Sequence, residues 1–181
     1  MKLLNGSLFD FQISQLITEK FNIVINFNQI IITATKPEIS ENKIAEVISL
    51  LINAANLQNI IAVGFNFHWY LKEESKSLEV LSKELFYSSS IDLFSSFFSD
   101  ENSMFGVYAS TDFKNSHLKL DVKPNKFQEI NNPVQHNIIN FAYNFHFDIK
   151  DKNDNALILT YLQEYILYKK RSEEITTKYS K

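Results

Sequence analysis

Cysteine is absent from this chain of 181 residues. Without thiols the chain forms no disulfide, has no thiolate nucleophile and offers no ligand set for a Cys-bound zinc ion or an iron–sulfur cluster. Disulfides belong mainly to oxidising compartments, so their absence is in keeping with the cytoplasmic location that we expect.

Glycine and proline are scarce, with three residues of each. No P-loop and no G-x-G-x-x-G motif can be written with so few glycines, which excludes the nucleotide-binding sites built on those motifs. Most turns must therefore rely on Asn, Asp and Ser. Two further motifs, H-E-x-x-H and G-x-S-x-G, are also missing from the sequence, and whether the chain is an enzyme stays open at this stage.

Positive charge is limited: Arg171 is the only arginine, and the formal net charge is −3. Arginine is the preferred residue for phosphate and base-edge contacts, so we expect no nucleic-acid partner. No stretch approaches the roughly 20 apolar residues of a membrane helix. The first six residues also turn polar too soon for a signal-peptide core. We therefore expect neither a membrane nor a secreted protein.

Aromatic residues are abundant by contrast, with 16 Phe and 8 Tyr. Alternation of apolar and polar residues predicts strands over 21–35, 59–71, 104–123 and 137–149. The segment 21–35 is either a hairpin that turns near Asn28 or one long bent strand. The segment 104–123 is expected to be a hairpin, residues 124–136 a loop, and the first 20 residues a short strand followed by a helical turn over 14–20.

Helical periodicity predicts a helix at about 41–55, with Ser40 as its N-cap and Asn56 as its end. Two further helical pieces are expected within 76–99 and a long helix from about Asp154 onward. The second piece of 76–99 is rich in Phe and Ser, so it is either a helix that caps one end of the core or an exposed lid or docking segment.

These elements predict an α+β fold with a mostly antiparallel sheet of five to six strands. The helix at 41–55 and the C-terminal helix are expected to pack on the apolar face of that sheet. Residues 1–181 are expected to form a single α+β domain, since the length is typical of one domain.

Two of the predicted strands share a local pattern of aromatic-Asn-aromatic-His-aromatic residues, at 65–69 and 143–147. If these strands pair in register, one polar face gathers six side chains that a small ligand could contact. They are Asn66, His68, Tyr70, Asn144, His146 and Asp148.

Two imidazoles and a carboxylate are suitable ligands for a divalent metal, and a His near an Asp can act as a general base. The alternative is an ordinary solvent-facing side of an antiparallel sheet. Because metal sites normally have three or more strong ligands with supporting partners, we predict no metal, no cofactor and no catalytic residue. The other two histidines, His117 and His136, have no evident partner in the sequence.

Two functional hypotheses follow. The first is a non-enzymatic interaction or assembly module, a small cytoplasmic protein that self-associates or docks in a larger complex. It depends on the missing catalytic motifs and the abundant aromatic residues. The second is a small-ligand- or metal-binding domain, possibly catalytic, that uses the face with Asn and His.

Overall fold

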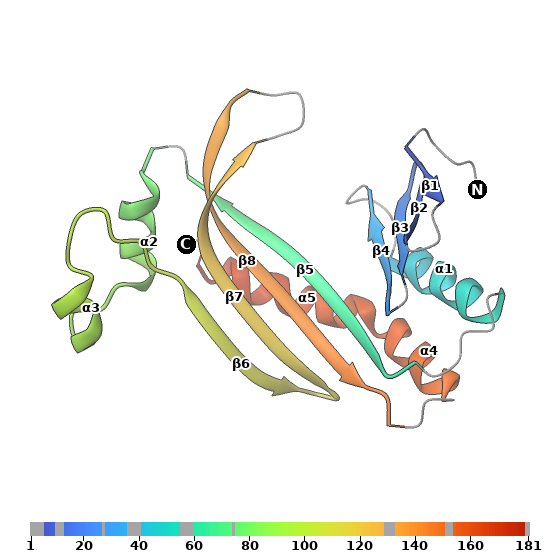
Figure 1. Cartoon of the computed structure of the whole chain (residues 1–181). Helices are drawn as coiled ribbons and strands as arrows, with labels where there is room; N and C mark the ends of the chain where they lie inside the picture. Colours follow the sequence, from blue (N-terminus) through green and yellow to red (C-terminus); the bar gives the residue numbers. More distant parts are fainter. Residues whose placement is uncertain are drawn as a thin grey trace. The chain divides into compact units, whose positions relative to one another are not determined.

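The computed structural model describes residues 6–9, 13–26, 28–35, 41–54, 60–73, 75–128, 133–150 and 154–179. Within them the chain forms two antiparallel sheets and five helices, which confirms the α+β class (Figure 1). The chain divides into two compact units, one of residues 1–60 and 151–166 and the other of residues 61–150 and 167–181. That residues 1–181 form a single domain remains a prediction.

The first unit contains a four-stranded meander in the order β1-β2-β3-β4. The helical turn predicted over 14–20 is wrong, because most of that segment lies in a strand paired with its neighbour over residues 22–26. Cross-strand pairing there outweighs the helical spacing of the local apolar residues. The strands are β1 (Leu8–Phe9), β2 (Ile13–Ile17), β3 (Phe21–Asn26) and β4 (Ile30–Ala34).

The hairpin form of 21–35 is the observed one, and Asn26 makes its turn. The Asn26 side-chain oxygen accepts hydrogen bonds from the backbone N–H groups of Asn28 and Gln29, both at 2.9 Å. An Asn side chain that bonds to backbone two residues ahead replaces the glycine that such turns often use.

Two helices accompany this sheet, α1 (Glu41–Ala54) and α4 (Asn155–Gln163). Phe21, Ile23 and Ile44 form the buried centre of this unit's core, where α1 meets β3. The helix predicted at 41–55 is confirmed, whereas its predicted cap Ser40 and end Asn56 lie outside the described residues.

The second unit contains a larger sheet in the order β5-β8-β7-β6 (Figure 1). The predicted hairpin within 104–123 is present, and the two strands with the shared aromatic pattern are neighbours in the sheet. The strands are β5 (Ala62–Lys72), β6 (Val107–Phe113), β7 (Ser116–Gln128) and β8 (Gln135–Asp148).

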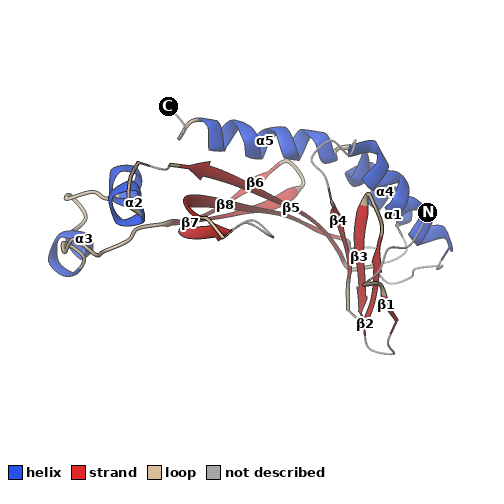
Figure 2. Cartoon of the chain, turned by 90° about the horizontal axis from the view of Figure 1, so that it is seen from above, coloured by secondary structure: helices blue, strands red, loops and turns tan. Residues whose placement is uncertain are grey.

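One face of the second sheet is aromatic and is covered by α5 (Tyr165–Thr177), which lies along that side in Figure 2. Tyr168 is fully buried there, and its ring centroid lies 5.1 Å from those of both Phe145 and Phe147. Burial of a large aromatic side chain contributes on the order of 1.5–3 kcal/mol. The aromatic strands therefore supply much of this core.

Two helices precede β6: α2 (Leu78–Phe86), which Ser77 caps, and α3 (Asp92–Phe97). Both were predicted as pieces of 76–99. Leu78 and Leu81 of α2 are buried, whereas α3 has no buried residue. None of the helices in the described part of the chain is both long and apolar enough to cross a membrane.

The arrangement differs from the expected single sheet of five to six strands in two respects. There are two sheets, and each has its own helix: α1 packs in the core of the first, and α5 covers the second. The expected loop at 124–136 is wrong for its two ends, since β7 continues through Pro124 to Gln128 and β8 begins at Gln135, whereas residues 129–132 lie outside the described residues. Proline is tolerated at position 124 because β6 pairs with β7 only as far as Val122, so that one side of β7 is an open edge.

Candidate functional site

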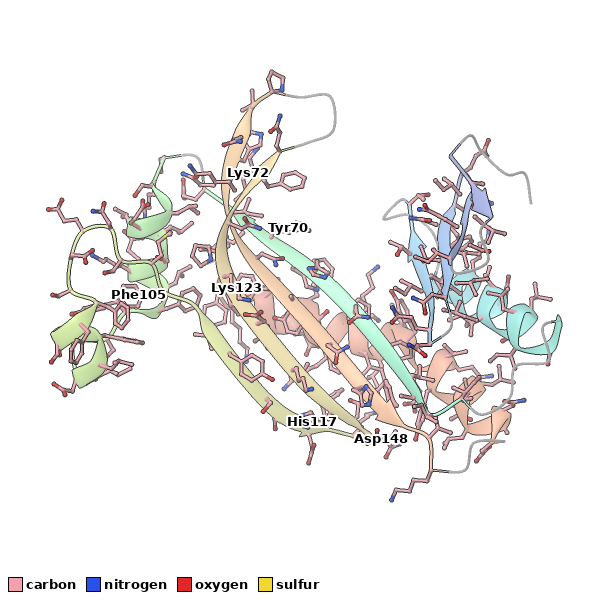
Figure 3. All side chains as sticks on the ribbon, in the orientation of Figure 1. Tyr70, Lys72, Phe105, His117, Lys123 and Asp148 are labelled. Carbon is pink, nitrogen blue, oxygen red and sulfur yellow. The ribbon has the colours of Figure 1, made fainter. Side chains whose placement is uncertain are left out.

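The second sheet has a polar face opposite α5, which we call the open face (Figure 3). It consists of alternate residues of all four strands, which side-chain alternation places on the side away from the buried Phe and Tyr residues. The residues that define it are Asn66, His68, Tyr70, Tyr108, Ser110, Asp112, His117, Lys119, Asp121, Lys123, Asn140, Asn144, His146 and Asp148.

All six residues of the sequence-predicted site lie on the open face, because β5 and β8 pair with Asn66 directly opposite Asn144. The Asn144 amide donates a hydrogen bond of 2.8 Å to the side-chain oxygen of Asn66. This bond links the two strands at the solvent-exposed surface. Because the two amide side chains bond to each other, they have fewer donors and acceptors left for a ligand.

The two predicted histidines do not meet. His146 lies opposite Gly64, which is four residues from His68 along β5 and therefore about 13 Å away. His68 instead contacts the Asn140 side-chain oxygen through Nδ1 at 3.4 Å. A site that needs both imidazoles on one ion is therefore absent from this pair.

His146 has a different neighbour, His117 of β7, which lies directly opposite it. Each of the two is bonded to a carboxylate: His146 Nε2 lies 3.1 Å from Asp148 Oδ1, and His117 Nδ1 lies 3.0 Å from Asp112 Oδ1. Sequence reasoning missed His117. The signal was its alternation with Lys119 and Asp121, which indicates a polar strand face, but the register that joins that face to β8 is not readable from the sequence.

The other end of the open face is aromatic and basic. Tyr70 stacks on Phe127 with ring centroids 5.7 Å apart, and the Lys123 ammonium lies 2.6 Å from the Asp121 carboxylate. Figure 3 shows Tyr70 and Lys123 toward this end and His117 and Asp148 toward the opposite end. The six predicted residues are thus spread along the sheet and do not converge on one point.

The chemistry available on the open face is that of exposed groups. The side chains of His117 and His146 are each more than 40 % exposed, so water screens their interactions with charged groups. Among the residues that the structure describes, His, Asp and Glu form no group of three or more arranged to hold a metal ion.

A second surface combines exposed apolar side chains on and around α3. We call it the α3 surface and define it by Ile91, Leu93, Phe97, Phe98 and Met104. Phe97 is 74 % exposed and Leu93 is 54 % exposed. Of the two interpretations of this segment, the docking segment is the one that such exposure favours, since a helix that caps a core buries its large apolar residues.

The α3 surface is nevertheless attached to the unit in a defined way. Phe94, on the inner side of α3, lies 5.0 Å from the ring of buried Phe105 and 6.3 Å from that of Tyr87. The backbone N–H of Phe105 donates to the hydroxyl of the fully buried Ser82 at 3.1 Å. One aromatic residue therefore anchors the helix while its other large side chains stay in solvent.

Comparisons of the chain with protein-family models, with curated proteins and with solved structures returned no match.

Proposed function

We propose that this chain is a non-enzymatic interaction module of the cytoplasm, which docks a protein partner on the α3 surface and also self-associates. The observation that carries the proposal is the exposure of large apolar side chains on a helix with no buried residue. Contiguous apolar side chains on a protein surface are typical of interaction sites, whereas scattered single ones are not.

The charge around the α3 surface indicates what kind of partner fits. Residues 88–104 contain Asp92, Asp100 and Glu101 but no Lys or Arg. Lys83 of α2 donates to the main-chain oxygen of Asp100, whereas the Asp100 carboxylate accepts hydrogen bonds from neighbouring groups of its own loop. An apolar surface with an acidic rim fits a basic amphipathic helix of a partner protein, because opposite charges at the rim favour encounter and register.

A binding titration tests this proposal. The probe is a fluorescent synthetic helix with Leu on one face and Lys on the other, and its anisotropy is followed as the full chain is added. We expect saturable binding that weakens with salt. The same helix with Glu in place of Lys is expected to bind at least tenfold more weakly.

The control variants separate the α3 surface from general stickiness. Leu93→Ser with Phe97→Ser is expected to abolish binding, whereas Leu50→Ser, at a 68 % exposed leucine of α1, is expected to leave it unchanged. Equal binding by the double variant, or no preference for the Lys helix, would contradict the proposal. Sedimentation with anionic vesicles that depends on Phe97 would also overturn it, in favour of a membrane surface.

The alternative function, a small polar ligand or metal on the open face, has one specific observation in its favour. His117 and His146 are cross-strand neighbours, and each imidazole has a carboxylate partner, as metal-bound histidines usually do. This alternative predicts that Zn²⁺ or Ni²⁺ raises the melting temperature of the chain and that His146→Ala removes the rise. His68→Ala is the matched control, and an equal rise in all three proteins would exclude the site.

A further inference from the structure

Strand β6 is the outer strand of the second sheet, and in the described part of the chain it pairs on one side alone, with β7. The backbone N–H and C=O groups on its other side are therefore directed outward. An edge of this kind is a template for another strand, and proteins usually protect it with charged side chains such as Lys, with Pro, with a bulge or by keeping the strand very short.

Of these protections β6 has a single one, the acidic side chain of Asp112, which is bonded to His117 of the neighbouring strand. The seven residues of β6, Val107–Phe113, include no Lys, no Pro and no Gly, and six of them are exposed. Val107 and Ala109 are among these exposed residues, and they lie on the same side of the sheet as its aromatic face. At the opposite edge of the sheet, by contrast, Phe65 and Phe67 of β5 are buried. β6 is thus the edge on which apolar side chains stay uncovered.

We propose that two copies of this chain associate by pairing their β6 strands antiparallel across a two-fold axis at Ser110. The proposal rests on the self-association part of the proposed function and names its surface. It joins two four-stranded sheets into one continuous sheet, with the open faces on one side and both α5 helices on the other.

The register follows from the geometry of an edge strand. Only alternate residues direct their backbone groups outward, so pairing must set residues of equal parity opposite each other. A two-fold axis at Ser110 does this over all of Val107–Phe113. Val107 then lies opposite the partner copy's residue 113, a phenylalanine, which buries apolar surface that the single copy exposes.

The charges of the paired strands are compatible with this register. Asp112, the only acidic or basic residue of β6, lies opposite the tyrosine at position 108 of the other copy, so no two acidic residues face each other. Tyr108 is 67 % exposed in the single copy, and its hydroxyl can donate to that carboxylate. A phenol–carboxylate hydrogen bond is favourable where two carboxylates would repel.

The absence of cysteine makes a direct test possible. Ser110→Cys introduces the only thiol of the chain at the two-fold axis. There the two Cα atoms are expected at about 4.5–5.5 Å, within the range that a disulfide spans. Mild oxidation is expected to convert this variant almost completely to a covalent dimer. Asp112→Cys, on the same strand and face, sets its two thiols about 13 Å apart and is expected not to cross-link. Equal cross-linking of both variants would overturn the proposal.

A second variant tests the dimer while leaving the fold and the α3 surface intact. Ser110→Glu lies opposite Lys119 within its own copy and therefore gains an ion pair there, while two glutamates oppose each other across the axis. Sedimentation equilibrium is expected to give twice the chain mass of 21.1 kDa for the wild type and one chain mass for Ser110→Glu. A wild type that sediments as one chain overturns the dimer. The titration with the basic helix still decides the α3 docking, since Ser110 does not belong to the α3 surface.

Discussion

Helices α5 and α3 of the second unit differ in burial in the opposite sense to that suggested by their compositions. The part of α5 in this unit is rich in Lys, Arg, Glu, Ser and Thr, yet it buries Tyr168, Ser172 and Thr176 against the sheet. α3 is apolar and aromatic, yet it buries no residue. The difference teaches that burial depends on the surface available to a helix and on partners for its polar groups, and not on hydrophobicity alone.

The buried hydroxyls of α5 are satisfied on both sides. Ser172 accepts a hydrogen bond of 2.8 Å from the Trp69 indole N–H and donates one to the Lys169 carbonyl. The Thr176 hydroxyl donates to the Ser172 carbonyl at 3.0 Å and lies 2.9 Å from the hydroxyl of Tyr143. In the part of the chain that the structure describes, no buried side-chain nitrogen or oxygen lacks a hydrogen-bond partner. Small polar residues that are paired in this way can be buried with little loss of free energy.

The largest expected effect is that of Tyr168→Ala on α5. The Tyr168 side chain is fully buried, and its ring also lies 5.6 Å from those of Phe65 and Phe113. Removing it leaves a large cavity, so we expect a loss of about 3–5 kcal/mol in the free energy of unfolding, measured by urea denaturation. Tyr70→Ala, on the exposed open face, is the control. A loss below about 1 kcal/mol for Tyr168→Ala would mean that α5 does not cover the sheet in solution.

The next effect concerns the polar contact of α5. Ser172→Ala leaves the Trp69 N–H without its acceptor, which costs about 1–3 kcal/mol, offset by about 0.5 kcal/mol from the better helix propensity of alanine. Because Trp69 is the only tryptophan, its fluorescence reports the site during urea unfolding. Thr177→Ala, on the exposed side of the same helix, is the control and is expected to change stability by less than about 0.5 kcal/mol.

The contrast between the two helices explains how much of the fold the sequence predicts. Alternation identified β5 and β8, because period two is a local property. Helical periodicity predicted the last helix from about Asp154 onward, but not which of its later residues are buried. Ser172 and Thr176 follow Tyr168 at helical spacing, but a hydroxyl counts as polar until its partner on a distant strand is known.

The candidate site has the same limit. Its six residues could be assigned to one face from alternation and assumed pairing, and they do lie on one face. The opposition of His117 and His146 depends on the pairing of β7 with β8, which is a non-local property of the register. The division of the strands into two sheets, and the edge position of β6, are non-local for the same reason.

The next prediction concerns how the stability of the chain depends on pH through Tyr143, which lies beneath α5. Burial raises the pKa of the Tyr143 hydroxyl above its usual value near 10, and this outweighs the opposite effect of its bond to Thr176. The folded state therefore holds this proton more tightly than the unfolded state. Its contribution to stability is fully present below about pH 10 and is lost as the pH rises through the folded pKa.

Tyr143→Phe isolates that contribution. Above pH 10 the variant is expected to lose less stability per pH unit than the wild type, in urea denaturation at a series of pH values. Tyr108→Phe, which changes an exposed tyrosine, is expected to follow the wild-type profile. Identical slopes for Tyr143→Phe and the wild type would mean that the phenol is solvated and that this end of α5 is open.

The smallest expected effect is on α3, where Phe97→Ser removes a phenyl ring that is 74 % exposed. No core contact is lost, so we expect the free energy of unfolding to change by less than about 0.5 kcal/mol. Phe94→Ser, in the same helix, removes the ring that packs on Phe105 and Tyr87, and is expected to cost more. If both serine variants were equally destabilising, α3 would be a capping helix of the core like α5. If Phe97→Ser leaves stability unchanged and abolishes binding of the basic helix, the exposed ring serves the partner and not the fold.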